Sequence, residues 1–374
     1  MNHGQNSAVR PRWVWTGILV WVAVALPGPE AHGYRFFTAL NEDPYPPSAA
    51  GARRWDDAIW APGAMLTWVV ADDPGWTSSW TDSSGALRQP PFGSPADVVP
   101  FVRTALEAWS GIRSADIRWE VSGVDASLDD ADGEDGRPTI FVDPEAERGS
   151  YAWRTSKRID GVWKTVDCEV PLAPFAAATI AENPWWTFVL IHEFGHCLGL
   201  AHAGAYPRIN EGQGQDLRGS FGIDPLMSYG TFTGDLVHLA TDDRVGASLL
   251  RPAPNWARST GAIAGSVTSG EDPAPFVQVF ANRVSGGAAT GAVGSFTNEE
   301  GAFVIEGLEP GRYLLWAGPL NVLLAHGSMI RQAELDAAEQ ALLLPVTVTR
   351  GAVADGVEIS LRATRDGPAT TGAR

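Results

Sequence analysis

The stretch that most constrains this chain is residues 191–202, whose sequence is I-H-E-F-G-H-C-L-G-L-A-H. Its fixed positions form the pattern H-E-x-x-H-x-x-G-x-x-H and are His192, Glu193, His196, Gly199 and His202. Residues four apart lie on one face of a helix, so His192 and His196 can present two imidazoles to one metal ion. A glycine at 199 permits the backbone angles that turn the chain back, which makes His202 a third ligand. Three protein ligands leave a position open for water, as in a catalytic zinc site.

The alternative interpretation of this stretch is a helix whose histidines lie on a solvated face. A bare H-E-x-x-H pattern occurs by chance in many chains, but each further fixed position lowers the chance rate by about twentyfold. Gly199 and His202 are two such positions. The full pattern resembles the metzincin metallopeptidase signature, whose second half is a methionine turn downstream. The sequence L-M-S-Y-G at 226–230 is similar to that turn.

The resemblance implies a zinc endopeptidase in which His192, His196 and His202 hold Zn²⁺. Glu193 would act as the general base that takes a proton from the zinc-activated water. Met227 would lie in the turn that forms an apolar floor under the imidazoles.

Tyr229 is the second candidate catalytic residue. The spacing M-x-Y resembles the astacin and serralysin branches, where the tyrosine ligates zinc and stabilises the oxyanion, whereas matrixins usually have proline there. A packed aromatic side chain is the other interpretation of Tyr229. The run D-D-R-x-G-x-x-x-L at 242–250 resembles the closing helix of matrixin-type domains.

Local patterns around the motif predict an α+β layout. β-Branched and aromatic runs predict strands at 64–70, 117–121, 139–142, 150–153 and 164–170. Helical spacing and capping residues predict helices at 94–109, from about 184 through the motif, and at 241–250. We therefore expect residues 53–255 to form a metzincin-type catalytic domain, a twisted mixed sheet with an active-site helix. By resemblance, 150–153 would be the sheet edge that binds an extended peptide, and a plain surface strand is the alternative.

A second region, 258–362, predicts a C-terminal all-β sandwich. Short strand patterns separated by turn residues occur at 261–267, 276–281, 302–305, 312–316 and 357–361. The run G-x-F-x-I-x-x-L-x-P-G-x-Y at 301–313 resembles the core of carboxypeptidase-regulatory-like, transthyretin-like domains, which implies a fold and no chemistry. Residues 320–344 depart from that family's spacing and suggest an insertion, and 363–374 suggest a flexible tail.

The N-terminus has the pattern of an export signal. Arg10 and Arg12 precede an apolar run at 13–24 that is short for a membrane span, and cleavage fits after Ala25 or Ala31. An uncleaved anchor is the alternative. We expect residues 1–31 to be a signal peptide, 32–52 to be a leader or wrapping segment, and the protein to be secreted.

The chain has two cysteines, Cys168 and Cys197. Export makes a disulfide between them chemically possible, and two buried free thiols are the alternative. Separately, the run from Asp129 to Asp135 offers several carboxylates with a glycine among them. Such a loop can wrap Ca²⁺, which takes about six or more oxygen ligands, although acidic loops are usually just solvated.

The formal net charge of −17 argues against nucleic acid and anionic membrane surfaces as partners, and no stable membrane insertion is expected. The leading hypothesis is therefore a monomeric, secreted zinc endopeptidase that acts on protein or peptide substrates. The alternative is a noncatalytic extracellular binding or adhesion protein, in which the sandwich attaches to a surface or glycan and the metalloprotease-like domain is a scaffold. The presence of Glu193 favours the enzyme, because a lapsed enzyme would most easily have lost its general base.

Overall fold

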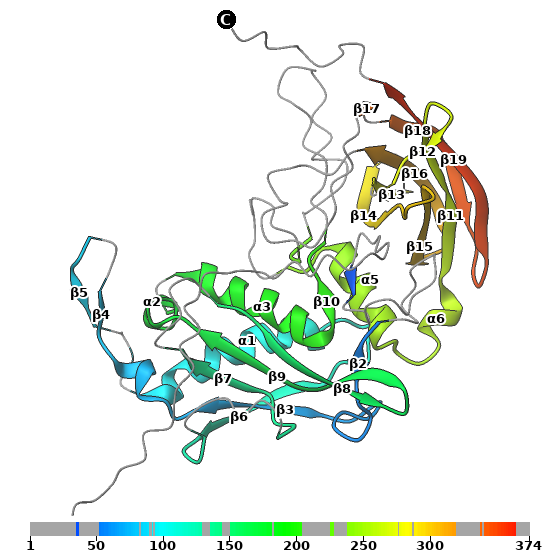
Figure 1. Cartoon of the computed structure of the whole chain (residues 1–374). Coiled ribbons are helices and arrows are strands. Elements are labelled where there is room, and N and C mark those ends of the chain that lie inside the picture. Colours follow the sequence, from blue (N-terminus) through cyan, green and yellow to red (C-terminus); the bar gives the residue numbers. More distant parts are fainter. Residues whose placement is uncertain are drawn as a thin grey trace, which may run out of the picture.

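The computed structural model describes residues 35–36, 52–81, 84–89, 92, 94–128, 135–143, 150–181, 183–203, 225–227, 238–275, 277–285, 288–318, 337–338 and 340–363. These residues form a mixed α/β structure built mostly of strands in several sheets (Figure 1). Within them, no helix combines the length and apolar character needed to cross a membrane. The expected signal peptide at 1–31 and the tail beyond 363 lie outside the described residues.

The N-terminal half contains a six-stranded mixed sheet, whereas the sequence patterns predicted five strands and did not indicate the strand at 54–55. Its strands are β2 (Arg54–Trp55), β3 (Leu66–Ala71), β6 (Trp119–Asp125), β7 (Thr139–Val142), β8 (Trp153–Ile159) and β9 (Val162–Leu172). The order β2-β9-β7-β3-β6 is parallel throughout, and β8 pairs antiparallel with β9. Strand β8 is therefore an edge strand. It spans residues 153–159, so it begins at the last residue of the strand predicted at 150–153. Ser150 lies outside the strand and pairs with Leu172 in an isolated bridge.

Three helices lie over this sheet, namely α1 (Val99–Ser110), α2 (Pro174–Thr179) and α3 (Pro184–Leu198) (Figure 1). The predicted helix at 94–109 begins as a separate 3₁₀ turn, η3 (Pro95–Val98), before α1. Helix α3 carries the motif, and its N-cap is Asn183, whose side-chain oxygen accepts the N–H of Trp185 at 3.1 Å. The indole N–H of Trp109 on α1 donates to the carbonyl of Ile191 on α3 at 2.8 Å, inside the core.

Several short elements surround the sheet. They are β1 (Arg35–Phe36), η2 (Pro74–Thr77), β4 (Trp80–Thr81), β5 (Leu87–Arg88) and β10 (Leu200–Ala201). Strand β1 pairs antiparallel with β10, directly before His202. Part of the expected leader segment is thus a strand beside the motif.

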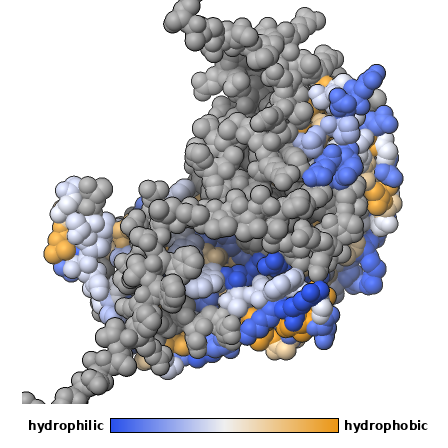
Figure 2. Space-filling view, viewed as in Figure 1, coloured by the Kyte–Doolittle hydropathy of each residue, from blue (hydrophilic) through white to orange (hydrophobic). Residues whose placement is uncertain are grey.

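The C-terminal half begins with α5 (Thr241–Leu250) and α6 (Trp256–Ser259), followed by two stacked sheets that we call the C-terminal sheets. One contains β11 (Gly261–Ser269), β12 (Asp272–Pro273), β15 (Ala302–Leu308), β17 (Ala337–Ala338) and β19 (Val353–Ala363). The other has the order β14 (Ala288–Phe296), β13 (Gln278–Ser285), β16 (Gly311–Gly318) and β18 (Gln340–Val348). Apolar residues of both sheets are buried together, including Ile263, Phe303, Leu315 and Ile359. Hydrophilic residues occupy much of the visible outer surface of these sheets (Figure 2).

Four described strands of the C-terminal sheets have no counterpart in the sequence expectations: the two-residue strands β12 and β17, and the longer strands β14 and β18. Strand β14 is rich in alanine and glycine, which have low strand propensity, so its place is set by pairing with β13. Strand β18 includes residues 340–344 of the expected insertion, so those residues belong to the sheet.

Candidate metal centre

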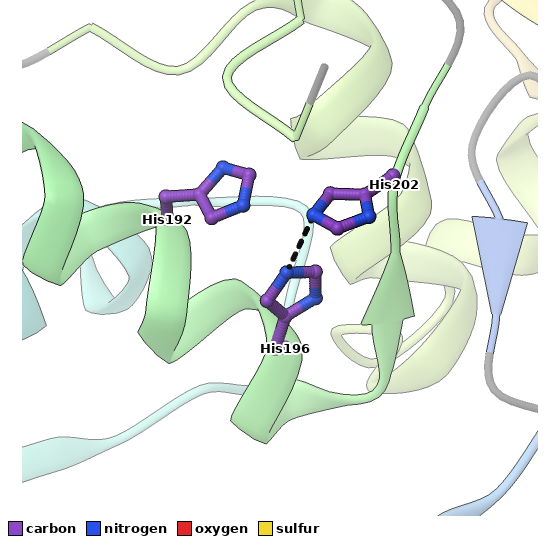
Figure 3. A group of neighbouring side chains, drawn as sticks. All are labelled: His192, His196 and His202. Atoms are coloured by element: carbon purple, nitrogen blue, oxygen red, sulfur yellow. Dashed lines mark hydrogen bonds between the residues drawn. The ribbon is translucent and has the colours of Figure 1, made fainter. Parts of the chain in front are cut away.

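The structure brings the three predicted histidine ligands together (Figure 3). His192 and His196 project from one face of α3, and His202 follows β10. One ring nitrogen from each lies within 4.8 Å of the other two. The Nε2 atoms of His196 and His202 are 3.1 Å apart. Ligand nitrogens on a tetrahedral zinc are separated by about 3.4 Å, given bonds of about 2.0–2.1 Å. The arrangement therefore fits a small divalent cation, and it does not by itself identify which one.

Gly199 makes this convergence possible. Its φ of 122° lies in a region that L side chains rarely adopt, and it ends α3. A Cβ at this position would lie 2.9 Å from the carbonyl oxygen of Arg53. Glycine therefore lets the chain reverse into β10 and bring His202 back to the helix face.

Two of the imidazoles are held by backbone carbonyls. Nδ1 of His192 lies 2.8 Å from the carbonyl oxygen of Leu226, and Nδ1 of His196 lies 2.8 Å from that of Leu200. A carbonyl oxygen can only accept, so each Nδ1 carries the proton and each Nε2 keeps its lone pair for a metal. Burial lowers the pKa of His192 to about 4 and that of His196 well below its usual 6.5. Both rings therefore remain neutral, as ligands must be, across the neutral and mildly acidic range.

Glu193 is buried on the same helix and is 7% exposed. Its carboxylate accepts a hydrogen bond from the backbone N–H of Ala152, just before β8. Burial dominates this interaction and raises the pKa of Glu193 to about 8 from its usual 4.5. Without a metal ion beside it, the carboxyl group is therefore mostly protonated at neutral pH, whereas a bound divalent cation would favour the carboxylate, the form that a general base requires.

Met227 and Trp109 pack against α3 at Gly195, and we call Leu226 and Met227 the floor of the site. Met227 is 2% exposed, as expected for a methionine turn. A Cβ on Gly195 would lie 2.3 Å from Sδ of Met227 and 2.7 Å from Cζ2 of Trp109. Only glycine therefore fits between the two histidines of α3. Tyr229 lies outside the described residues, and its catalytic role stays a prediction.

Replacing Gly195 by alanine is expected to destabilise the protein, because the added methyl group overlaps Met227 and Trp109. Overpacking of this kind costs about 1–3 kcal/mol, and we expect Tm to fall by roughly 3–10 °C and zinc affinity to fall with it. Thermal unfolding and a zinc competition titration measure the two effects. In a Met227→Ala background the same substitution should cost less, because one of the two overlaps is gone. An equal cost in both backgrounds would exclude the Met227 contact as the cause.

Asp243 is a site residue that motif analysis did not identify. Its carboxylate accepts the backbone N–H groups of Leu226 at 2.7 Å, Met227 at 3.1 Å and Ala240 at 2.9 Å. The run D-D-R after the methionine turn was the available signal, but in sequence it indicates only the acidic first turn of a helix. Its contact with the floor depends on the tertiary structure.

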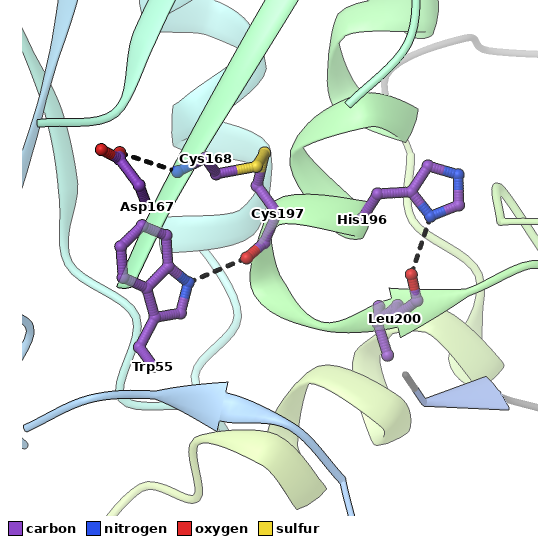
Figure 4. Close-up of a disulfide and its surroundings, with 6 residues drawn as sticks. All are labelled: Trp55, Asp167, Cys168, His196, Cys197 and Leu200. Carbon is purple, nitrogen blue, oxygen red and sulfur yellow. Dashed lines mark hydrogen bonds between the residues drawn. A yellow bond between two sulfur atoms is a disulfide. The ribbon is translucent and has the colours of Figure 1, made fainter. Parts of the chain in front are cut away.

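A disulfide joins Cys168 on β9 to Cys197 on α3, with the Cα atoms 5.6 Å apart (Figure 4). This confirms the bridged alternative over two free thiols. The carbonyl of Cys197 also accepts the indole N–H of Trp55 at 2.8 Å. The end of α3 that carries His196 is thus attached to the sheet both covalently and by a buried hydrogen bond.

The expected calcium loop is described only in part. Residues 129–134 lie outside the described residues, and Asp135 accepts the backbone N–H of Arg137 at 2.8 Å. Among the residues that the structure places, the three histidines form the group suited to a metal. Calcium binding stays a prediction.

No family model matches the sequence, and no curated protein matches it. Among solved structures, the GM1-bound form of the ECX AB5 holotoxin is 13% identical, over 60% of this chain and 80% of that one, with a TM-score of 0.26. Wild-type OgpA from Akkermansia muciniphila is 11% identical, over 82% of this chain and 99% of that one, with a TM-score of 0.24. A 9R-lipoxygenase from Cyanothece PCC8801 is 11% identical, over 30% and 18%, with a TM-score of 0.18. These similarities are too low to carry an argument about fold or function.

Proposed function

We propose that this chain is a secreted, zinc-dependent endopeptidase of the metzincin type, with Glu193 as general base. The observation that carries the proposal is the convergence of His192, His196 and His202 within 4.8 Å. Structural zinc sites usually have four protein ligands, whereas a group of three leaves a coordination position for water. The mixed sheet with one antiparallel edge strand, the helix α3 and the buried Met227 support the metzincin assignment.

Glu193 handles the proton in this mechanism. A bound zinc ion supplies Lewis acidity for the attacking water and the scissile carbonyl group. Glu193 takes a proton from the water as its oxygen bonds to the carbonyl carbon, and delivers it to the amide nitrogen as the C–N bond breaks. The N–H of Ala152 holds the carboxylate in place between these two events.

The substrate is a protein or peptide bound in extended form along β8. Among the described strands β8 pairs only with β9, so its other edge offers backbone groups to a substrate strand. Tyr151 and Trp153, 42% and 57% exposed, flank Ala152 and offer aromatic surface to substrate side chains. An exposed hydrophobic patch also lies near the turn between β8 and β9, where Val162 is 58% exposed (Figure 2).

Secretion is part of the proposal. The Cys168–Cys197 disulfide supports it, because disulfides persist in oxidising compartments and are rare in the cytosol. The C-terminal sheets, in this proposal, are a carboxypeptidase-regulatory-like sandwich with no chemistry of its own.

Chelation is expected to abolish hydrolysis of an unfolded protein such as casein, because the proposed mechanism needs a metal at the three histidines. Added zinc should restore cleavage, and elemental analysis of the purified protein should find about one zinc per chain. Glu193→Ala should be inactive under all of these conditions. Cleavage that persists after chelation and in Glu193→Ala would contradict the proposal. Zinc binding without cleavage of any unfolded protein would favour the noncatalytic binding protein instead.

A further inference from the structure

Two adjacent aspartates lie in the first turn of helix α5, and both are buried. Asp242 and Asp243 are each 1% exposed. Asp243 faces the metal centre, where it accepts the N–H groups of Leu226 and Met227. Burying a carboxylate is unfavourable unless hydrogen bonds satisfy it, so these contacts fix the backbone of the floor relative to α5.

The backbone of Leu226 links Asp243 to His192, one of the three histidines of the centre. Its N–H donates to Asp243 at 2.7 Å, and its carbonyl oxygen accepts the Nδ1–H of His192 at 2.8 Å. The orientation of the His192 ring is therefore set by a residue that is itself held by α5. Mutation of a residue that supports a metal ligand through hydrogen bonds typically changes the metal affinity by about 10–100-fold.

Asp242 faces the opposite way, toward the C-terminal sheets. Its Oδ1 accepts the backbone N–H of Gly294 on β14 at 2.7 Å. Its Oδ2 is buried and has no hydrogen-bond partner among the described residues. Among the described residues, Gly294 of β14 therefore supplies the hydrogen bond that the Asp242 side chain accepts.

Close packing reinforces the same interface. A Cβ on Gly291 of β14 would lie 2.2 Å from Oγ1 of Thr241. A Cβ on Gly307 of β15 would lie 2.7 Å from Cγ1 of Val245. Helix α5 is therefore packed against the C-terminal sheets with no room for a side chain at either glycine. Through Asp243 the same helix contacts Leu226 and Met227.

We propose that Asp242 and Asp243 are positioning residues through which the docked C-terminal sheets set the orientation of His192, and hence the affinity of the three-histidine centre for its metal. The C-terminal sheets are then a structural part of the metal centre, whatever else they bind. This inference rests on the metal-binding part of the proposed function and not on peptidase activity.

Asp242→Ala is expected to weaken zinc binding by about 10-fold or more, because it removes the acceptor for Gly294 and loosens α5. Competition with a chromophoric chelator measures the zinc Kd, and the absorption spectrum of the cobalt-substituted protein reports ligand geometry. Asp242→Asn, which keeps an oxygen acceptor, should restore most of the affinity. Asp272→Ala removes an exposed aspartate of β12 and is the matched control, with wild-type values expected. An unchanged Kd and cobalt spectrum in Asp242→Ala would overturn the inference.

Hydrogen exchange of the wild-type protein tests the same coupling without a variant. Linkage is reciprocal, so a metal that is bound more tightly when the sheets are docked must also stabilise their docking. Adding zinc to the metal-free protein should slow amide exchange in β14, with a smaller change in β19 as the internal comparison. Equal exchange in β14 with and without zinc would contradict the coupling, even if Asp242→Ala fails to fold. Failure of the wild-type protein to bind zinc would instead reject the proposed metal centre itself.

Discussion

Glu193→Gln is expected to lower kcat by roughly 10²–10⁴-fold, because it removes the group that transfers the proton. Glutamine keeps the shape of the side chain and an oxygen acceptor for the N–H of Ala152, so KM and zinc content should change little. Steady-state kinetics on a fluorogenic peptide, with zinc content measured on the same sample, separates these effects.

The same substitution should stabilise the metal-free protein at high pH. The pKa of Glu193 is raised to about 8 in the folded state, so the stability it contributes is fully present below its usual pKa of 4.5. That stability is lost as pH rises from about 4.5 to 8, because the unfolded chain ionises Glu193 more readily. Glutamine cannot ionise, so chelator-treated Glu193→Gln should unfold roughly 5–10 °C above the wild type at pH 9.

Two comparisons make these results specific to Glu193. At pH 4 the two metal-free proteins should have equal Tm, since Glu193 is then protonated in both the folded and unfolded states. Glu107→Gln changes an exposed glutamate of α1 and should have wild-type kcat and Tm. Full activity in Glu193→Gln would remove Glu193 from the mechanism.

Removing the disulfide by Cys168→Ala together with Cys197→Ala is expected to cost about 3–4 kcal/mol, from the chain entropy released in the unfolded state. The bridge closes a loop of 29 residues in sequence separation. Its loss should lower Tm by roughly 10 °C. Because Cys197 follows His196 at the end of α3, zinc affinity should fall as well.

Reduction of the wild-type protein provides the control for this double substitution. Reduced wild type and the double variant should unfold at similar temperatures, since both lack the cross-link. Alkylation without reduction should find no free thiol in the wild-type chain. Two alkylatable thiols, or an unchanged Tm in the variant, would contradict a stabilising bridge.

Local sequence patterns predicted the elements near the motif well. The spacing of the histidines and the capping side chain of Asn183 predicted α3, and Gly199 predicted its end. These features depend on contacts within a few residues, so the sequence alone specifies them. The edge of the sheet was predicted less well, because β8 is defined by its pairing with β9 over residues 153–159, which no local pattern encodes.

The C-terminal sheets show the same distinction. Strands with β-branched and aromatic residues, such as β11 and β16, were predicted near their observed positions. Strand β14 was not, because its alanines and glycines carry no strand signal. Gly291 of this strand has a different role, since it allows Thr241 of α5 to approach closely.

The sequence by itself determined which three histidines converge, because a helix and one glycine turn bring residues at fixed spacing to one point. The tertiary structure decided the support for those histidines. Three contacts that support the site join residues distant in the chain. They are the hydrogen bond between His192 and the carbonyl of Leu226, the hydrogen bond from Leu226 to Asp243, and the Cys168–Cys197 disulfide. Contacts of this kind depend on which helices and sheets pack together. The local pattern of a single sequence does not say which distant elements contact each other.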